Sequence, residues 1–482
     1  MYFNSFHFIG FYALVLAVVA LLAHRIRARN AVLLVASYYF YACWDWRFLV
    51  LIGISTVVDY FCGLAFAVDD LEVPPPRSRK RDAVLLVSVG TNLGLLGFFK
   101  YFDFFVDSGA AFLTALQMPM TPRALGIILP VGISFYTLQT LSYTIDVYRG
   151  KTLTERDPIT FALFVAFFPQ LVAGPIERAK RLLPQLRKPS VIDGDKLNSG
   201  FYLMGWGLFK KTVLADNVAL VVDQIWSAPE PSGVAVLLGL YCFAIQLYCD
   251  FSAYSDIARG AARCMGFELM LNFDLPFSAT NPTEFWRRWH ISLSTWLRDY
   301  LYFPLGGGRK GRARAHFNLV LTMVVSGVWH GAGWPFFLMG LTYGLQLSIH
   351  KELRPWLDRI QPSRAAVKAG WYGIRVVAML HLFTLPLIFF RSLTMEKVLS
   401  MSGSALSQPL PATWGVVMPW LTVFGWVLLT LAAMEVAQKV ADDHDVVARL
   451  PVGARALVYA AMILGIIVFG VVDGEAFVYF QF

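Results

Sequence analysis

The sequence predicts an all-α polytopic membrane protein, and three observations support this fold class. Hydrophobic residues make up 57% of the 482 residues and charged residues only 15%, against roughly 25% charged residues in a soluble domain. Aromatic residues reach 15%, as expected where Trp and Tyr lie at membrane interfaces. The basic residues behind the net charge of +9 gather in short loops between apolar runs, so this charge does not indicate nucleic-acid binding.

Clusters of Lys and Arg predict which loops face the cytoplasm, because short cytoplasmic loops retain positive charge. The clusters are Arg25–Arg29, Arg77–Arg81, Arg149–Arg156, Arg178–Lys188, Arg309–Arg314, Lys351–Lys368 and Lys439–Arg455. The segments Asp107–Pro122 and Thr394–Thr413 carry almost no basic residues. We therefore expect these two segments to be extracytoplasmic loops.

The N-terminal segment is expected to be an uncleaved first helix that starts outside. Met1–Gly10 has no Lys or Arg, and Arg25 follows the first apolar run, which is the reverse of a secretory signal. A hairpin is expected at Cys43–Trp46. Later spans, alternately outward and inward, are expected at Ala83–Phe105, Leu125–Tyr148, Trp371–Phe390, Val416–Gln438 and Ala456–Val472. Both chain ends are then extracytoplasmic, including a tail at residues 477–482.

The middle of the chain does not fit simple crossings. Phe161–Ile176 is apolar but is interrupted by Pro169 and Gly174, and basic clusters flank both ends. Two flanks on one side predict a re-entrant segment, which requires protein or water to cover its irregular backbone. Phe285–Tyr302 mixes charged residues with Trp and Leu, which predicts an amphipathic helix at an interface or in a protein-lined funnel.

His330 is the first candidate functional residue. It lies in Thr322–Leu341, a run without a formally charged residue, and a titratable side chain in such a run is a functional candidate by default. Gly331 and Gly333 are expected to interrupt the helix and let backbone or substrate approach the ring. The alternative is a structural histidine that hydrogen-bonds a neighbouring helix.

His290 is the second candidate and lies in Asn281–Tyr302. A neutral imidazole can take a proton from a hydroxyl near neutral pH, which is the step that acyl transfer to an alcohol needs. Alternatively, His290 hydrogen-bonds water and headgroups at the membrane interface. Glu284 and Arg288 are four residues apart and are expected to form an ion pair on a helix.

The remaining charged residues and the cysteines have simpler interpretations. Asp250 and Asp256 are expected to cap helix ends or to pair with Arg259 or Arg263, and a catalytic role is the alternative. No HExxH motif or Cys/His ligand spacing is present, so no metal site is predicted. The five cysteines lie in or beside apolar segments without a CxxC pair and are expected to be small core residues; they are Cys43, Cys62, Cys242, Cys249 and Cys264.

The basic loop Arg309, Lys310, Arg312 and Arg314 admits two interpretations. It is first a signal that this loop faces the cytoplasm. The same side chains could also hold the phosphates of a nucleotide-bearing donor from the cytosol.

Blocks of sequence along nearly the whole chain carry a family resemblance. They are MYFNSFHF at Met1, SYYFYACWDWRFL at Ser37, LPVGISFYTLQTLSYTIDVYRG at Leu129, FFPQLVAGPIER at Phe167, YCDFSAYSDIARGAARCMGF at Tyr248, TEFWRRWHISLSTWLRDYLYFPLGG at Thr283, SGVWHGAGWPFFLMGLTYG at Ser326, and the ending FVYFQF. The chain resembles the membrane-bound O-acyltransferases, in the bacterial branch that modifies polysaccharides such as alginate. Gly308 and Ala253 depart from the Asn and Gly that are common in relatives.

The resemblance implies a ring of transmembrane helices, with re-entrant and interfacial helices, around a thinned centre. A cytosolic tunnel and an outer funnel would meet there at His330. It also implies that His290 and His330 form the catalytic pair, in a core at residues 281–350. We expect one membrane-embedded domain over residues 1–482.

The implied function is transfer of acetyl groups from cytosolic acetyl-CoA, a substrate rather than a bound cofactor, across the bacterial inner membrane. The acceptor would be an extracytoplasmic polysaccharide, reached through a periplasmic SGNH-type acetyltransferase or a similar partner. Alginate, cellulose, peptidoglycan or an exopolysaccharide remain open as the polymer.

Two alternatives remain for the function. D-alanyl or other acyl transfer from a carrier protein is the first, but that branch carries a motif comparable to FVYFQF on a separate small partner. A transporter whose central histidine relays protons is the second, although the chain lacks the inverted repeat that many transporters show.

Tyr479 offers the only hydroxyl in FVYFQF. Four aromatics in six residues would anchor such a tail at the membrane interface, and this is the simpler interpretation. The comparable motif in the D-alanyl system ends in a tyrosine thought to carry the acyl group. The resulting hypothesis is that Tyr479 accepts acetyl from acetyl-CoA, with His330 as base, and passes it to the periplasmic partner.

Overall fold

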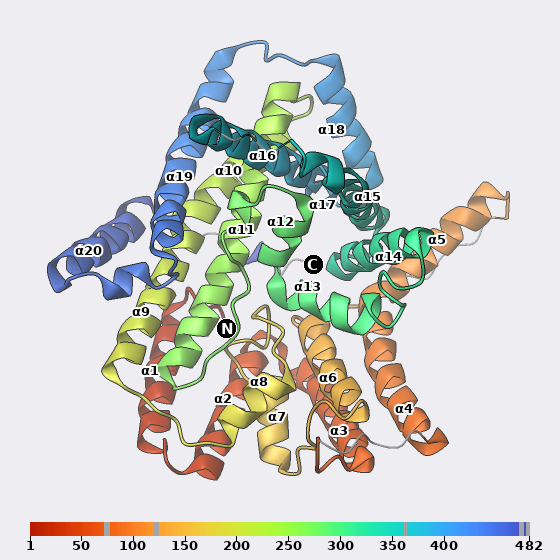
Figure 1. The fold of residues 1–482 in the computed structure, drawn as a ribbon, viewed down its shortest axis with the longest axis vertical. Coiled ribbons are helices and arrows are strands. Elements are labelled where there is room, and N and C mark those ends of the chain that lie inside the picture. The colour runs from red at the N-terminus through yellow and green to blue at the C-terminus, as the bar shows by residue number, and fades with distance from the viewer. Residues whose placement is uncertain (72–77, 119–124, 361, 363, 472–476, 479–482) are drawn as a thin grey trace. The chain divides into compact units, whose positions relative to one another are not determined.

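The computed structural model describes residues 1–71, 78–118, 125–360, 362, 364–471 and 477–478. All regular secondary structure in these residues is helical (Figure 1). Six helical segments in the described residues are long and apolar enough to cross a membrane: Ile26–Phe66, Arg79–Ala115, Gly233–Cys264, Ala365–Ser392, Trp414–Ala441 and Val452–Phe469. The predicted all-α, multi-pass fold class is confirmed, whereas the direction of each span stays a prediction.

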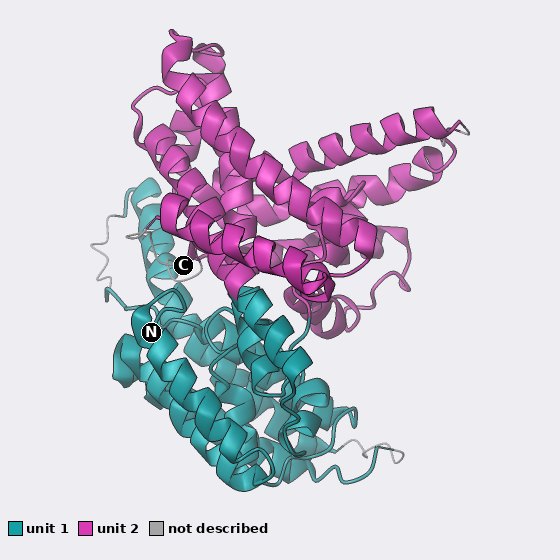
Figure 2. Ribbon diagram, turned by 90° about the vertical axis from the view of Figure 1, so that its left-hand side faces the viewer, with its two compact units in different colours: residues 1–204, 254–270, 482 teal, residues 205–253, 271–481 magenta. Residues whose placement is uncertain are grey.

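The chain forms two compact units (Figure 2). Unit 1 contains Met1–Met204 and Tyr254–Met270, and unit 2 contains Gly205–Ala253 and the described part of Leu271–Gln481. The boundary falls inside two helices, α9 (Gly194–Phe209) and α11 (Gly233–Cys264). The single domain over residues 1–482 and the tail at 477–482 stay predictions.

Unit 1 is built from eight complete helices within its described residues. They are α1 (Phe6–Leu21), α2 (Ile26–Asp45), α3 (Leu49–Phe66), α4 (Arg79–Leu96), α5 (Phe102–Ala115), α6 (Ile133–Tyr148), α7 (Pro158–Ala166) and α8 (Ala179–Leu186). Asp45 is extended and a 3₁₀ turn follows it at Trp46–Phe48, so the chain breaks where the hairpin was predicted. Phe161–Ile176 forms most of α7 and the turns after it; its re-entrant course stays a prediction.

Helix covers part of each of two segments that were predicted as loops. Asp107–Pro122 contains the end of α5, and Thr394–Thr413 contains α18 (Met395–Ser407). The prediction was wrong because the lack of basic residues indicates on which side of a membrane a segment lies, not its secondary structure. α6, in contrast, is shorter than the expected span Leu125–Tyr148 and begins only at Ile133.

Unit 2 contains the remaining helices and both candidate histidines. The helices are α10 (Asp216–Ser227), α12 (Pro282–Arg288), α13 (Ile291–Leu297), α14 (Arg312–His330), α15 (Trp334–Leu357), α16 (Ala365–Thr384), α17 (Leu387–Ser392), α18, α19 (Trp414–Ala441) and α20 (Val452–Phe469). A π-helical turn at Lys210–Ala215 joins α9 to α10.

The uncharged run Thr322–Leu341 is divided between α14 and α15, which pack tightly against each other. An added Cβ on Gly327 would lie 2.2 Å from the carbonyl oxygen of Phe336, and one on Gly340 would lie 2.4 Å from that of Met323. Small residues allow this kind of close backbone contact between helices. The pair therefore gives His330, at the end of α14, a rigid support.

Candidate functional site

The backbone breaks at His290. The single amphipathic helix predicted for Phe285–Tyr302 is wrong, because α12 ends at Arg288 and α13 begins at Ile291. Between them, His290 adopts φ 42° and ψ 55°, the left-handed region that non-glycine residues rarely occupy. Such a conformation persists only where its surroundings enforce it, and it is common at functional sites.

Asn272 provides much of that enforcement. Its backbone oxygen accepts a hydrogen bond from the Ile291 N–H at 2.9 Å. Its Oδ1 accepts from the Ser292 hydroxyl at 2.9 Å and from the Ser292 N–H at 3.3 Å. Asn272 is fully buried, so these bonds do not compete with water. One asparagine thus fixes the start of α13 and the residue before it.

The imidazole of His290 lies in an aromatic environment. Phe251 packs edge-on against it, with ring centroids 4.6 Å apart, and Phe273 stacks at 6.5 Å. Only 1% of His290 is exposed. Burial, and secondarily the neighbouring His330, lowers the pKa of His290 well below its ordinary value of 6.5. The ring is therefore neutral at pH 7, the form that can accept a proton.

His330 lies beside His290, as the last residue of α14. The centroids of the two imidazole rings are 6.4 Å apart. Trp329 and Phe390 contact the His330 ring, with centroids at 5.0 and 5.7 Å. Two histidines from separate sequence motifs, 40 positions apart in the numbering, are thus brought together within unit 2.

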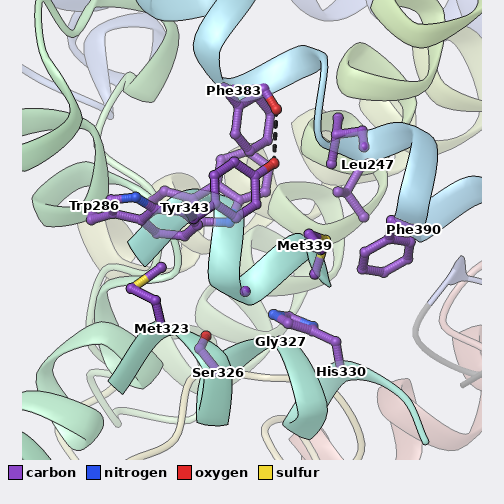
Figure 3. Close-up of a pocket in the computed structure, with 13 residues that line it drawn as sticks. Leu247, Trp286, Met323, Ser326, Gly327, His330, Met339, Tyr343, Phe383 and Phe390 are labelled. Carbon is purple, nitrogen blue, oxygen red and sulfur yellow. Dashed lines mark hydrogen bonds between the residues drawn. The ribbon is translucent and has the colours of Figure 1, made fainter. Parts of the chain in front are cut away.

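A small cavity opens beside His330 (Figure 3). Its volume is about 20 Å³, enough for about one water molecule. Figure 3 shows the His330 imidazole at its edge, below Met339 and Phe390. On the far side the Tyr343 hydroxyl donates to the Phe383 carbonyl oxygen at 2.7 Å. A ligand larger than a water molecule would require the lining side chains to move. The lining residues are Leu247, Trp286, Trp289, Met323, Ser326, Gly327, His330, Met339, Gly340, Tyr343, Phe383, Leu387 and Phe390.

The basic loop, whose last residues Arg312 and Arg314 form the first turn of α14, is exposed to solvent and is not part of this lining. Its four side chains, Arg309, Lys310, Arg312 and Arg314, are all exposed. Arg312 pairs with Glu352 on α15, so its charge is already partly compensated. The other end of the loop is held by Asn318, whose side-chain amide donates to the Gly307 carbonyl oxygen at 2.9 Å.

Glycines give the basic loop its backbone course. Gly306, Gly307 and Gly311 have φ of 106°, 55° and 87°, values that side-chain-bearing residues rarely adopt. The loop therefore depends on glycine at these positions.

The secondary expectations from the sequence have mixed outcomes. The ion pair of Glu284 with Arg288 is confirmed, at 3.1 Å, and Asp256 pairs with Arg259 at 3.3 Å. The expectation for Asp250 was wrong, because it lies inside α11 and pairs with Lys211 at 2.9 Å. A long-range partner of this kind leaves no local sequence signal.

Cysteines and possible metal ligands add little to the site. Cys43 is exposed and the other four cysteines are buried. Among the described residues, no group of three or more His, Cys, Asp or Glu side chains is arranged to hold a metal ion. Tyr479, the predicted acyl acceptor, lies outside the described residues, and its role stays a prediction.

Several residues around the histidine pair were not among those predicted from the sequence. Asn272 left one usable signal, as an isolated amide in the apolar run from Leu269 to Phe273. Phe251 and Phe390 left none, because aromatic residues are abundant throughout this chain.

Comparison with known proteins gives a consistent result. Residues 153–391 match the model of MBOAT, the membrane-bound O-acyltransferase family. The chain is 44% identical over 328 residues to "Probable alginate O-acetylase AlgI" of Pseudomonas putida, covering 68% of this chain and 66% of that protein. It is 35% identical over 397 residues to a peptidoglycan O-acetyltransferase of Helicobacter pylori, covering 76% and 72%. It is 30% identical over 246 residues to a teichoic acid D-alanyltransferase of Streptococcus thermophilus, covering 48% and 58%.

The matched regions do not extend over the full length of these proteins. The chain spans 62% to 66% of the length of the alginate relatives it matches. Both predicted histidines lie inside the matched family region, whereas residues 477–482 lie beyond it.

Proposed function

The chain belongs to the membrane-bound O-acyltransferase family, and on this premise we propose that it transfers acetyl groups from cytosolic acetyl-CoA toward an extracytoplasmic polysaccharide. The enzyme would lie in the bacterial inner membrane with both chain ends outside. One observation carries the proposal, namely two imidazole rings 6.4 Å apart, of which that of His330 lines a cavity. A histidine pair of this kind suits proton transfer from a hydroxyl.

The acceptor is proposed to be alginate, peptidoglycan or a similar envelope polysaccharide. The alginate relatives have the higher identity, and the peptidoglycan relative matches over more of the chain. Both are O-acetylating proteins by name, whereas the D-alanyl relative matches over less than half of the chain. The acetyl group is therefore favoured over D-alanine.

His330 is proposed as the general base. Its ring lines the cavity, where it would take the proton of the acceptor hydroxyl. The hydroxyl oxygen would then attack the thioester carbonyl carbon, the carbon–sulfur bond would break, and the coenzyme A thiolate would receive the proton from the imidazolium. His290, neutral and beside it, would orient or deprotonate the acceptor.

Tyr479 is proposed as the first acceptor of the acetyl group. A phenol has a pKa near 10, so a phenolate is a better leaving group than a sugar alkoxide. Transfer from acetyl-tyrosine to a sugar hydroxyl, through a periplasmic SGNH-type acetyltransferase or a similar partner, would therefore be favourable.

The donor is proposed to be attracted by the basic loop. Arg309, Lys310, Arg312 and Arg314 are exposed and could meet the phosphates of acetyl-CoA. Arg312 would contribute least, since Glu352 already pairs with it.

The decisive experiment incubates the purified full-length protein with radiolabelled acetyl-CoA and compares it with Tyr479→Phe. An acetyl-tyrosine peptide at residue 479, seen by mass spectrometry, is expected for the parent protein alone. Acetyl transfer to a polysaccharide acceptor is expected once the periplasmic partner is added. Tyr479→Phe keeps an aromatic anchor and removes the hydroxyl. Full polysaccharide acetylation by this variant would exclude the tyrosine relay, and no acetyl transfer at all by the parent would exclude acetyl-CoA as donor.

A further inference from the structure

Unit 2 contains a buried ion cluster that the reaction as described does not use. The Lys211 ammonium lies 2.8 Å from the Asp216 carboxylate and 2.9 Å from Oδ1 of Asp250. All three side chains are buried, and lysine and aspartate are almost never buried unless paired. A buried charge that loses its counter-charge is strongly unfavourable, so the three side chains form a fixed element of unit 2.

This cluster directly contacts Phe477 and Val478, which are called the C-terminal segment below. The second oxygen of Asp250, Oδ2, accepts a hydrogen bond from the backbone N–H of Val478 at 2.8 Å. The Lys211 ammonium lies 5.0 Å from the centre of the Phe477 ring, within the range of cation–π attraction. Phe477 and Val478 are only 1% and 5% exposed. The cluster therefore holds the segment through its backbone as well as through an aromatic ring.

The end of α20 and Val471 are held close to the same cluster. The lysine of the cluster belongs to the π-helical turn that joins α9 to α10, and π-helical turns are rare and frequent at functional sites. The Thr212 carbonyl oxygen on this turn accepts from the Val471 N–H at 3.1 Å. The Asn217 side-chain amide donates to the Phe469 carbonyl oxygen at 2.8 Å. The end of α20 is thus held by this turn and by the start of α10, while Phe477 and Val478 are held by Lys211 of the same turn and by Asp250 of α11.

The same cluster is linked to the histidine pair through α11. Asp250 and Phe251 are consecutive residues of this helix, and Phe251 packs against the His290 ring at 4.6 Å. The residue that holds Val478 is therefore the immediate neighbour of a residue that contacts His290.

We propose that Lys211, Asp216 and Asp250 form a dock that positions the C-terminal segment for acyl transfer at the histidine pair. Asp250 is the main positioning residue, and Lys211 holds its carboxylate in place. The inference rests on the proposed function, in which Tyr479, the residue after Val478, receives the acetyl group. Because Asp250 accepts a hydrogen bond from the peptide N–H of Val478, it fixes the register of the segment, that is, which of its residues lies at the cluster.

The dock can be tested on the full-length protein with Asp250→Ala, and with Asp256→Asn as a matched control on the same helix. Carboxypeptidase digestion followed by intact-mass measurement reports whether residues 477 and 478 are protected. In the parent and in Asp256→Asn, trimming is expected to stop before Val478, whereas in Asp250→Ala it should continue past Phe477. Acetyl transfer should fall at least about tenfold in kcat, since a hydrogen bond to a charged group contributes a factor of this order, with the KM for acetyl-CoA unchanged.

A second pair of variants covers the case in which Asp250→Ala fails to fold. Val478→Pro leaves the ion cluster intact but removes the N–H that Asp250 accepts, whereas Val478→Ala retains it. Val478→Pro should reproduce the loss in kcat at an unchanged melting temperature, and Val478→Ala should retain most of the activity. Equal activity of these two variants would overturn the proposal.

The trimming assay separates failure of the dock from failure of the proposed relay. Tyr479→Phe should remain protected from digestion, whatever its activity, so protection with full activity would exclude the relay and leave the dock standing. Trimming past Phe477 in the parent would exclude the dock itself. Release of the segment in Asp250→Ala without any loss of acetyl transfer would show that the contact only stabilises the fold, and would overturn the positioning role.

Discussion

Two helix breaks in unit 2 each present a histidine, but they are built in different ways. After His330, the chain leaves α14 through Gly331, whose φ of −160° and ψ of 150° are ordinary extended values. Between α12 and α13, His290 itself adopts φ 42°, and Asn272 holds the residues after it. The break after His330 depends on glycine, which has no side chain. The break at His290 depends on hydrogen bonds that offset backbone strain.

This difference predicts how each histidine tolerates change. His330 is supported by close packing, so it should be sensitive to added volume nearby. His290 is supported by polar contacts in a dry environment, so it should be sensitive to the loss of a single hydrogen-bonding group. The two regions can therefore be disturbed independently.

The largest effect is expected from His330→Ala. General base catalysis contributes roughly 10²- to 10⁴-fold, so acetyl transfer by the purified variant should fall by a factor in this range. Expression and melting temperature should persist, because His330 is only partly buried. More than half of the parent activity in a folded variant would exclude the role as base.

His290→Ala is expected to have a smaller and more selective effect. Because His290 is proposed to act on the acceptor, transfer to the acceptor should fall more than acetyl-CoA hydrolysis or binding. The two rates can be measured on one preparation with labelled acetyl-CoA. Loss of acetyl-CoA binding instead would place His290 on the donor side.

Asn272→Ala sharpens the same comparison, since it leaves the His290 imidazole in place. It removes the side-chain acceptor for Ser292. Transfer to the acceptor should therefore fall relative to acetyl-CoA hydrolysis, as in His290→Ala, but by a smaller factor. If Asn272→Ala lowered acetyl-CoA hydrolysis and transfer to the acceptor equally, the turn at His290 would not act specifically on the acceptor.

Much of this architecture could be predicted from the sequence, and the exceptions share a cause. The all-helical class, the break at Asp45 and the break after His330 follow from composition, periodicity and glycine, which act locally. The break at His290 could not be predicted, because Phe285–Tyr302 has the pattern of one amphipathic helix and Asn272 acts from outside it. The pairing of Asp250 with Lys211 was missed for the same reason, since the two residues come from different helices.

Gly331 and Gly333, which follow His330, differ in how closely they are packed. An added Cβ on Gly331 would lie 2.2 Å from the ring of Phe336, whereas one on Gly333 meets its nearest atom only at 3.5 Å. Gly331→Ala should therefore destabilise the protein by about 1–3 kcal/mol, the usual range for overpacking, and Gly333→Ala should have little effect on stability. Thermal unfolding of both variants checks this, and equal melting temperatures would contradict the packing argument.

The smallest effect is expected in the exposed basic loop. Replacing Arg309, Lys310 and Arg314 together with Gln should raise the Kd for acetyl-CoA several-fold at low salt, with kcat unchanged, because the loop does not line the cavity beside His330.

The salt dependence of this effect is the sharper measurement. Exposed charges are screened over about 8 Å at physiological ionic strength, so the difference between parent and variant should shrink as salt is added. Arg312→Gln serves as the matched control and should change the Kd less than the triple replacement, because Arg312 is already paired with Glu352. The contrary result would be that the triple variant, correctly inserted in the membrane, binds acetyl-CoA like the parent at low salt. The loop would then serve only as a topology signal.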